Sequence, residues 1–212
     1  MKKLILLARL ITMTTFALPL WIHSAQAWDI YVISGAGLVT INGKPAKIGD
    51  KFQGSDVLAT GANTKVKLLE GHSVMVVAEK TEVSAETKKL GKIALVATDK
   101  DTNPQLFLKS GKLRFQIDKP EAAKYRFRIP SVVAGVRGTE FFMSASKEKE
   151  VLCVLEGEVG AKIISNNKEA KVEKGIGWIR EGNKEGILIQ TTEQQRADWV
   201  SSTDIPAAGG AQ

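Results

Sequence analysis

Few side chains in this 212-residue sequence could take part in covalent or metal chemistry. The chain contains one cysteine, Cys153, and two histidines, His23 and His72. A nucleophile–base pair or a metal site needs residues of these types in converging positions. Cys153 stands within the apolar run VLCVL, which is typical of a small core residue, and His72 stands in a predicted turn. The sequence therefore predicts no enzyme, no metal site and no cofactor.

Basic side chains are the better candidates for a binding site. In KLRFQI and YRFRI, apolar and basic residues alternate with the period of two that is typical of a strand with one buried face. If such strands are neighbours, their outward cations form a stripe that suits an acidic protein or an anionic envelope polymer. The alternative is a solvated face whose lysines prevent edge pairing. The stripe would comprise Lys65, Lys67, Lys109, Lys112, Arg114, Arg126 and Arg128.

The first 27 residues have the features of a secretory signal peptide. A basic start, MKKLILLAR, precedes the apolar segment LITMTTFALPLW, which is too short to span a bilayer. Ala25-Gln26-Ala27 then fits the cleavage rule. We therefore expect cleavage after Ala27, a periplasmic or secreted protein, and no membrane span after cleavage. The net charge falls from +7 to +4, and no aromatic residues expected to be exposed interleave with the cations, so nucleic acid is not a predicted partner.

Short apolar runs separated by glycine predict an all-β fold for residues 28–190. KVKLLEGHSVMVV and VLCVLEGEVGAKI each contain two runs around Glu-Gly, and LKSGKLRFQI contains two around Ser110-Gly111. We interpret each glycine as the positive-φ residue of a tight reversal. The resulting architecture is a β-solenoid or a sandwich-like stack of short strands.

The C-terminal region differs from the strands. TTEQQRADWV predicts a short helix over residues 191–203, with Thr191 or Thr192 as N-cap and Trp199 docked against the strands. The irregular stretch 88–105 predicts a surface excursion, and residues 204–212 predict a flexible tail.

A charge and a glycine interrupt the apolar segment SVVAGVRGTEF at residues 131–141. Gly138 is expected to form a bulge or kink at which the strand changes direction or layer. Thr139 can return a hydrogen bond to the backbone that the bulge frees. Arg137 either donates hydrogen bonds to several carbonyl or carboxylate groups at this corner or binds a ligand. Phe141 and Phe142 point to opposite faces, so one of them is expected to be partly exposed.

The sequence resembles the FecR domain, which is named after the ferric citrate sensor protein. The resemblance covers roughly residues 57–182 and includes VKLLEGHSVMVV, LKSGKLRF, FRIPSVVAGVRGTEFFM, VLCVLEGEVGAKI and KVEKGIGWIREG. Its most specific element is the signature formed by Val136, Arg137, Gly138, Thr139 and Phe141. The resemblance implies an all-β module outside the cytoplasm that works by binding. In the sensors this module follows a membrane helix whose cytoplasmic end controls a sigma factor. We expect no such segment here, so sigma-factor regulation is not carried over.

These observations predict an exported, non-enzymatic binding module that engages an envelope protein or a polyanionic glycan. The candidate binding residues are Lys112, Arg114, Arg126, Arg128 and Arg137. The alternative is a structural scaffold component of an envelope assembly that has no soluble ligand. The sequence leaves the oligomeric state open.

Overall fold

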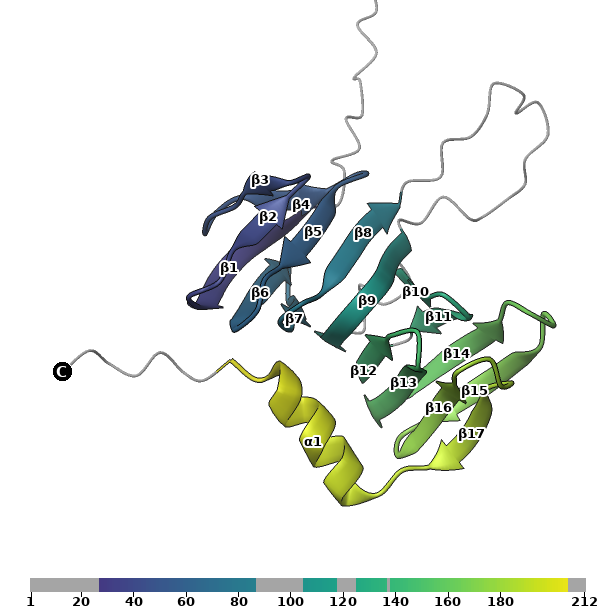
Figure 1. The fold of residues 1–212 in the computed structure, drawn as a ribbon. Coiled ribbons are helices and arrows are strands. Elements are labelled where there is room, and N and C mark those ends of the chain that lie inside the picture. Colours follow the sequence, from purple (N-terminus) through teal and green to yellow (C-terminus); the bar gives the residue numbers. More distant parts are fainter. Residues whose placement is uncertain (1–26, 87–104, 118–124, 137, 206–212) are drawn as a thin grey trace, which may run out of the picture.

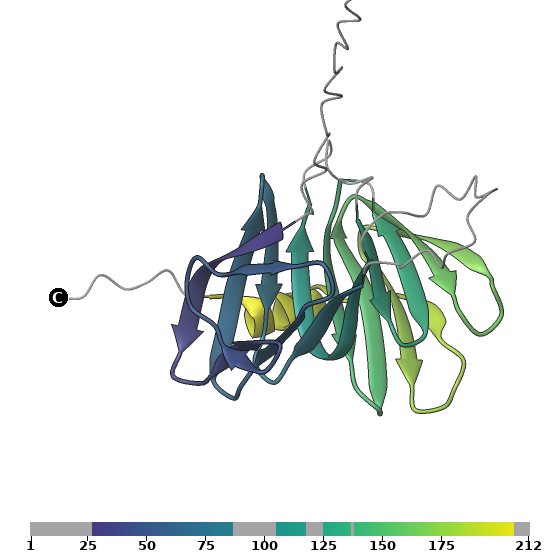
Figure 2. The ribbon, with the colours of Figure 1, turned by 90° about the horizontal axis from the view of Figure 1, so that it is seen from above.

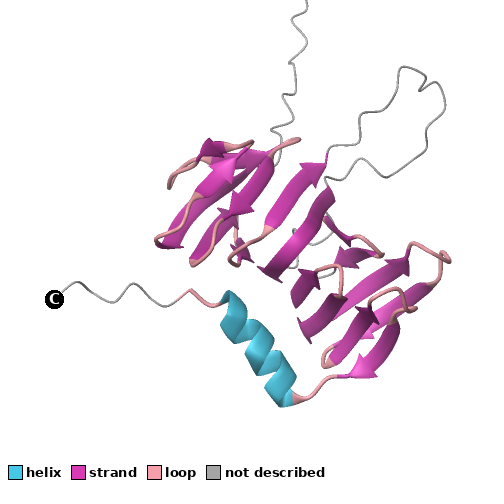
Figure 3. Ribbon diagram, viewed as in Figure 1, coloured by secondary structure: helices cyan, strands magenta, loops and turns pink. Residues whose placement is uncertain are grey.

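The computed structural model describes residues 27–86, 105–117, 125–136 and 138–205, which form seventeen strands and one helix (Figures 1 and 3). The expected signal peptide therefore lies outside the described residues except for Ala27, the first residue of β1. The expected excursion after residue 87, the residues of the tail from 206 onward, and Arg137 also lie outside them. No helix in the described ranges has the length and apolar character needed to span a membrane.

The strands pair in two sets that share β9, and we call these sets sheet A and sheet B. Sheet A has the order β4 (Lys51–Gln53), β1 (Ala27–Gly35), β6 (Thr64–Glu70), β7 (Ser73–Val77), β9 (Gln105–Gln116), β12 (Glu140–Ala145), β13 (Lys149–Glu156), β16 (Ile176–Glu181) and β17 (Ile187–Gln190). Sheet B has the order β3 (Lys44–Pro45), β2 (Val39–Ile41), β5 (Val57–Thr60), β8 (Glu82–Glu86), β9, β10 (Arg126–Ile129), β11 (Val132–Val136), β14 (Glu158–Ile163) and β15 (Glu169–Glu173). Only the β9–β10 pair is parallel among the described strands. The all-β class is confirmed, whereas the strand network is neither closed nor solenoid-like.

The hydrophobic core contains side chains from both sheets. Phe115 and Phe141 of sheet A meet Phe127 of sheet B, with ring centroids 4.1 to 5.1 Å apart, and all three side chains are fully buried. The period-two pattern predicted for residues 113–117 and 125–129 is confirmed, because their apolar side chains are buried. Burial of these aromatic rings is the main source of stability at the centre of the molecule.

Glycine and threonine meet where the chain passes from one sheet to the other. Gly138 has φ +63° and stands between β11 of sheet B and β12 of sheet A. Gly157, with φ +83°, stands between β13 of sheet A and β14 of sheet B. A Cβ atom at Gly157 would lie 2.7 Å from the Gly138 carbonyl oxygen and 2.8 Å from Cγ2 of Thr139. The two crossings are therefore packed together so closely that position 157 has no room for a side chain.

A second corner repeats this arrangement at β9. Gly111, with φ +99°, lies within β9, and a Cβ atom there would be 2.5 Å from Cα of Thr81. Residues of β9 before Gly111 pair with β8 and β10 in sheet B, and those from Gly111 onward pair with β12 and then β7 in sheet A. The predicted reversals at Gly111 and Gly157 are thus wrong, whereas Gly71 does lie in the turn between β6 and β7. A positive φ suits a sheet-to-sheet corner as well as a reversal, and only the pairing of the strands distinguishes them.

The predicted C-terminal helix is confirmed as α1 (Glu193–Thr203), which lies across sheet A (Figures 1 and 2). It begins with a capping box, in which the Thr192 hydroxyl accepts a hydrogen bond from the Gln195 N–H and the Gln195 side chain accepts one from the Thr192 N–H. Trp199 stacks on Phe142, with centroids 5.6 Å apart and an interplanar angle of 7°. Phe141 and Phe142 are therefore both buried, and the expectation that one is partly exposed is wrong, because α1 covers the outer face.

Candidate functional site

The basic residues predicted to form a single stripe lie on two different sheets. Lys112 and Arg114 occupy the sheet A part of β9, where Arg114 is in register with Phe142 of β12. Arg126 and Arg128 occupy β10 in sheet B. The sequence pattern correctly separates inward from outward residues in each strand. It contains no information on which of the two sheets the strand joins.

On sheet A, the predicted binding residue Arg114 already forms an ion pair with the residue that follows α1. The Arg114 guanidinium lies 2.8 Å from a carboxylate oxygen of Asp204, just after α1, and 3.7 Å from the Glu140 carboxylate. Only 21% of the Arg114 side chain is exposed. Arg114 thus has a structural role in the described part of the chain, and it is not available to an external ligand while α1 is docked.

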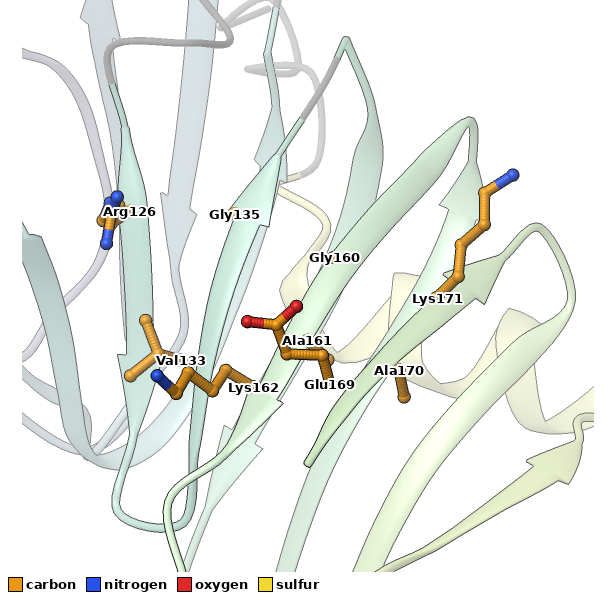
Figure 4. Close-up of a pocket in the computed structure, with 9 residues that line it drawn as sticks. All are labelled: Arg126, Val133, Gly135, Gly160, Ala161, Lys162, Glu169, Ala170 and Lys171. Carbon is orange, nitrogen blue, oxygen red and sulfur yellow. The ribbon is translucent and has the colours of Figure 1, made fainter. Parts of the chain in front are cut away.

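On sheet B, a groove of about 510 Å³ crosses the face formed by β10, β11, β14 and β15 (Figure 4). One row across this groove is in continuous register, from Arg126 through Gly135 and Gly160 to Lys171. The neighbouring row contributes Val133, Lys162 and Glu169. The groove therefore has two glycines on its floor and charged side chains along its sides.

The two glycines of the floor are not required by the backbone or by packing. Neither has a positive φ, and a Cβ atom at Gly135 or Gly160 would meet only a carbonyl oxygen, at 3.9 or 3.8 Å respectively. Glycine within a strand lowers stability and is often found where a ligand or another backbone approaches closely. The fold would accept a larger residue at both positions, and their lack of side chains is what opens the groove.

The cations that line the groove extend in different directions. The Lys171 ammonium lies 2.8 Å from Glu158 and 2.9 Å from Glu173, and these hydrogen bonds raise the pKa of Lys171 above its usual value. Figure 4 shows Lys171 extending away from the groove and Lys162 extending toward Val133. Lys162 is therefore the lining cation that Figure 4 places across the groove, and Arg126 lies on its β10 side.

Arg128 is placed beside the groove rather than in it. Its guanidinium carbon lies 4.8 Å from the centroid of the Phe107 ring, a cation–π contact between β10 and β9. The sequence interpretation included Arg126 but missed Lys162, Gly135 and Gly160. The available signal was the pair of glycines in the middle of the strand patterns VVAGV and EVGAKI.

The described residues contain no cluster of three or more histidine, cysteine or acidic side chains that could hold a metal ion. Cys153 lies in β13 beneath α1, and burial raises the pKa of its thiol to about 11. A thiol with this pKa is protonated at neutral pH and is a poor nucleophile. His72, in the turn after β6, belongs to a different part of sheet A and is not among the residues lining the groove.

Comparison with known proteins supports the resemblance found in the sequence. The model of the FecR protein family matches residues 56–160. Two crystal structures of candidate anti-sigma factors from Parabacteroides distasonis ATCC 8503 are similar in fold. One has 14% identity and a TM-score of 0.53, and the other 15% and 0.51. Each match covers 68% of this chain and 63% or 64% of the other, so this chain spans less than two thirds of either neighbour. No curated protein matches the sequence significantly.

The family match contains both glycine–threonine corners, at Gly111 and Gly157, and ends at Gly160 on the floor of the groove. Its C-terminal boundary leaves out β15, β16, β17 and α1, which complete the two sheets in this chain. Residues 56–160 of this chain thus form a FecR domain.

Proposed function

We propose that this protein is a non-catalytic binding module of FecR type, which works in the cell envelope and engages an envelope partner through the groove on sheet B. The observation that carries the proposal is the floor of the groove next to Arg126 and Lys162. This floor consists of two glycines that neither the backbone conformation nor the packing requires. A sandwich-like stack of strands would present this face rigidly, because both glycines lie in central strands that are paired on each side. Export by the N-terminal segment would place the groove in the periplasm or outside the cell.

An acidic segment of an envelope protein suits this groove better than a polyanionic glycan. None of the residues that line the groove is aromatic, so it lacks the flat apolar surface on which sugar rings or bases could pack. The glycine floor allows an extended backbone to approach the sheet closely. Arg126 and Lys162 could then pair with carboxylates of that segment.

Gly160→Val is expected to abolish partner binding while leaving the protein folded. Valine has room above the sheet and a higher strand propensity than glycine, so thermal stability should be retained or raised. Its side chain would occupy the floor of the groove. The measurement is photo-crosslinking of the tagged protein in its own cells, followed by quantitative mass spectrometry of the captured envelope proteins and by a thermal melt.

A charge variant provides an independent check. Arg126→Gln with Lys162→Gln should reduce capture of the same partner, whereas Lys51→Gln with Lys149→Gln removes two exposed cations elsewhere and should not. Equal capture by the Gly160→Val protein and the unaltered protein would disprove binding at the groove. Release of the partner by an anionic polysaccharide, but not by an acidic peptide, would favour the glycan.

A structural scaffold is the second candidate function, and the edge of sheet A favours it. β17 pairs only with β16 among the described strands, and it exposes 60% of Ile187 and 46% of Leu188. Exposed apolar edge strands can pair with another chain. Native mass spectrometry showing a defined homo-oligomer, which Ile187→Lys dissociates, would favour this function over the binding module.

A further inference from the structure

An apolar patch covers part of the outer face of sheet A. Its buried members are Phe142, Val151, Cys153 and Ile179, and the partly buried Leu155, Ile189 and Trp199 pack against them. Trp199 belongs to α1, whereas the others belong to the sheet. Among the described elements, α1 is the one that lies over this patch (Figure 1). Without α1, an apolar surface would face the solvent.

Few side chains of α1 are buried against this patch. Thr203 is the only buried residue of the helix, and the Trp199–Phe142 stack is its one aromatic contact with the described part of the chain. A helix of 11 residues is marginally stable in water on its own and depends on packing. The position of α1 must therefore be maintained by other interactions.

Two cations from the sheet hold the C-terminal end of α1. Lys65 of β6 donates hydrogen bonds to the carbonyl oxygens of Ser201, at 3.3 Å, and Asp204, at 2.8 Å. Arg114 of β9 pairs with the Asp204 carboxylate at 2.8 Å. The last turn contains no basic residue, so these two side chains supply the positive charge that the carbonyl end of a helix favours. We call Lys65, Arg114 and Asp204 the latch.

The two ends of α1 are attached by different kinds of contact. At the N-terminal end, Thr191 is buried, and both its N–H and its hydroxyl donate to the Gly175 carbonyl, at 2.9 and 2.7 Å. At the C-terminal end, Thr203 is buried as well, but the contacts of the latch are electrostatic, and 21% of the Arg114 side chain and 53% of the Asp204 side chain are exposed. Ion pairs with a solvent-exposed partner are screened by salt, whereas buried apolar and hydrogen-bonded contacts are not. Release of α1 would begin at the latch, with Thr192 as the hinge.

We infer that α1 is a releasable strap, and that the sheet A face beneath it is a second docking surface for an α-helix of a partner protein with an aromatic side chain and an acidic C-terminal end. The chemistry of this partner is inferred from α1, the helix that covers this surface in the structure. The stacking position over Phe142 accepts an aromatic ring, and Lys65 and Arg114 attract a helix that ends in carbonyl groups and a carboxylate. This surface is separate from the groove on sheet B and does not depend on the function proposed for that groove.

Cys153 provides a direct measure of strap release. It is the only cysteine of the chain, and its thiol lies beneath α1, 4.0 Å from the Thr191 hydroxyl. The rate at which a maleimide labels Cys153 therefore reports how often the face is open. Asp204→Asn and, separately, Lys65→Gln should each raise this rate about fivefold, the effect expected for losing one exposed charge contact at a helix end. In the unaltered protein, 1 M salt should act in the same direction, because charges are then screened within about 3 Å.

Lys51→Gln is the matched control for the latch variants. It removes an exposed ion pair, Lys51–Asp29 at 2.6 Å, from the other edge of sheet A, and should leave the labelling rate unchanged. Circular dichroism confirms that each variant is folded. A labelling rate that does not respond to Asp204→Asn, Lys65→Gln or salt would show that α1 is a fixed part of the fold. An equal response to Lys51→Gln would show general loosening. Either result would overturn the proposal.

Docking is tested with a synthetic peptide of residues 192–205 as the partner helix. Added at millimolar concentration to the Asp204→Asn protein, this peptide should slow the labelling of Cys153 back toward the unaltered rate. The same peptide with Trp199→Ala should not. If both peptides leave the labelling rate unchanged, the face opens without accepting a helix, and the docking surface is disproved even where strap release is observed.

Discussion

Glu150→Ala is expected to lower the free energy of unfolding by about 3 to 5 kcal/mol, the usual result of removing one partner from a buried ion pair. Glu150 of β13 is fully buried, and its carboxylate pairs with the Arg180 guanidinium of β16. It also accepts hydrogen bonds from the N–H and the hydroxyl of Ser131, at 3.1 and 3.2 Å. Ser131 lies in the turn between β10 and β11 of sheet B, so this carboxylate connects the two sheets.

The large effect follows from what remains after the substitution. Arg180 would keep its charge next to the core, and the Ser131 N–H would lose its acceptor in a partly buried position. Denaturation by urea, monitored by circular dichroism, measures the change. Glu181→Ala is the matched control, because Glu181 forms an exposed pair with Lys149 at 3.6 Å and should contribute less than about 1 kcal/mol. A loss of similar size in both variants would show that the Glu150 network does not connect the sheets as described.

Gly157→Ala is expected to lower the free energy of unfolding by about 2 to 5 kcal/mol, from backbone strain together with overpacking. Gly157 has φ +83°, a conformation that an L-residue rarely adopts. The added methyl group would lie 2.7 Å from the Gly138 carbonyl oxygen, which is backbone and cannot rotate away. One of the two crossings between the sheets would have to move.

Gly160→Ala, three positions further along the chain in β14, is the control for this prediction. Gly160 has no positive φ, and the nearest atom to its Cβ position is 3.8 Å away. Alanine there should raise stability by about 0.4 to 1 kcal/mol, because it reduces the entropy of the unfolded chain. The same denaturation experiment therefore has opposite expected signs at the two glycines. A destabilised Gly160→Ala protein or a tolerated Gly157→Ala would contradict the packing of the corner.

The backbone conformation and the packing require glycine at some of these positions but not at others. At Gly111 and Gly157, the backbone conformation and the neighbouring threonine exclude any side chain. At Gly135 and Gly160, the described structure would accept one. Stability explains the first pair, whereas the second pair lowers stability without a structural benefit, and the ligand proposed for the groove would account for it.

Much of the local structure could be predicted from the sequence. The alternation in residues 113–117 and 125–129 identifies the inward side chains, and Thr192 with Gln195 identifies the start of α1. Both signals are local, because the direction of a side chain depends on the period of its own strand and a helix cap depends on residues three apart. The family signature at residues 136–141 is likewise contained in one short segment, although Arg137 lies outside the described residues.

The candidate site depends on contacts that no local pattern contains. The sequence could not show that Arg114 and Arg126, both outward residues of alternating strands, belong to different sheets, because period two fixes a face and not a partner. It could not show that α1 would cover Arg114 and leave Arg126 beside an open groove. Nor could it align Gly135 with Gly160, since their register is set by the pairing of β11 with β14 across the whole strand network.

The sequence by itself determined the all-β class, the alternation of residues 113–117 and 125–129, the helix with its cap, and the small number of histidine and cysteine side chains. Only the tertiary structure decided which glycines turn the chain between sheets, which cations hold α1 and which face is left open. The physical reason is that side-chain direction and capping are set by neighbours in the chain. Sheet membership and register are set by the free energy of burying one common core between all the strands.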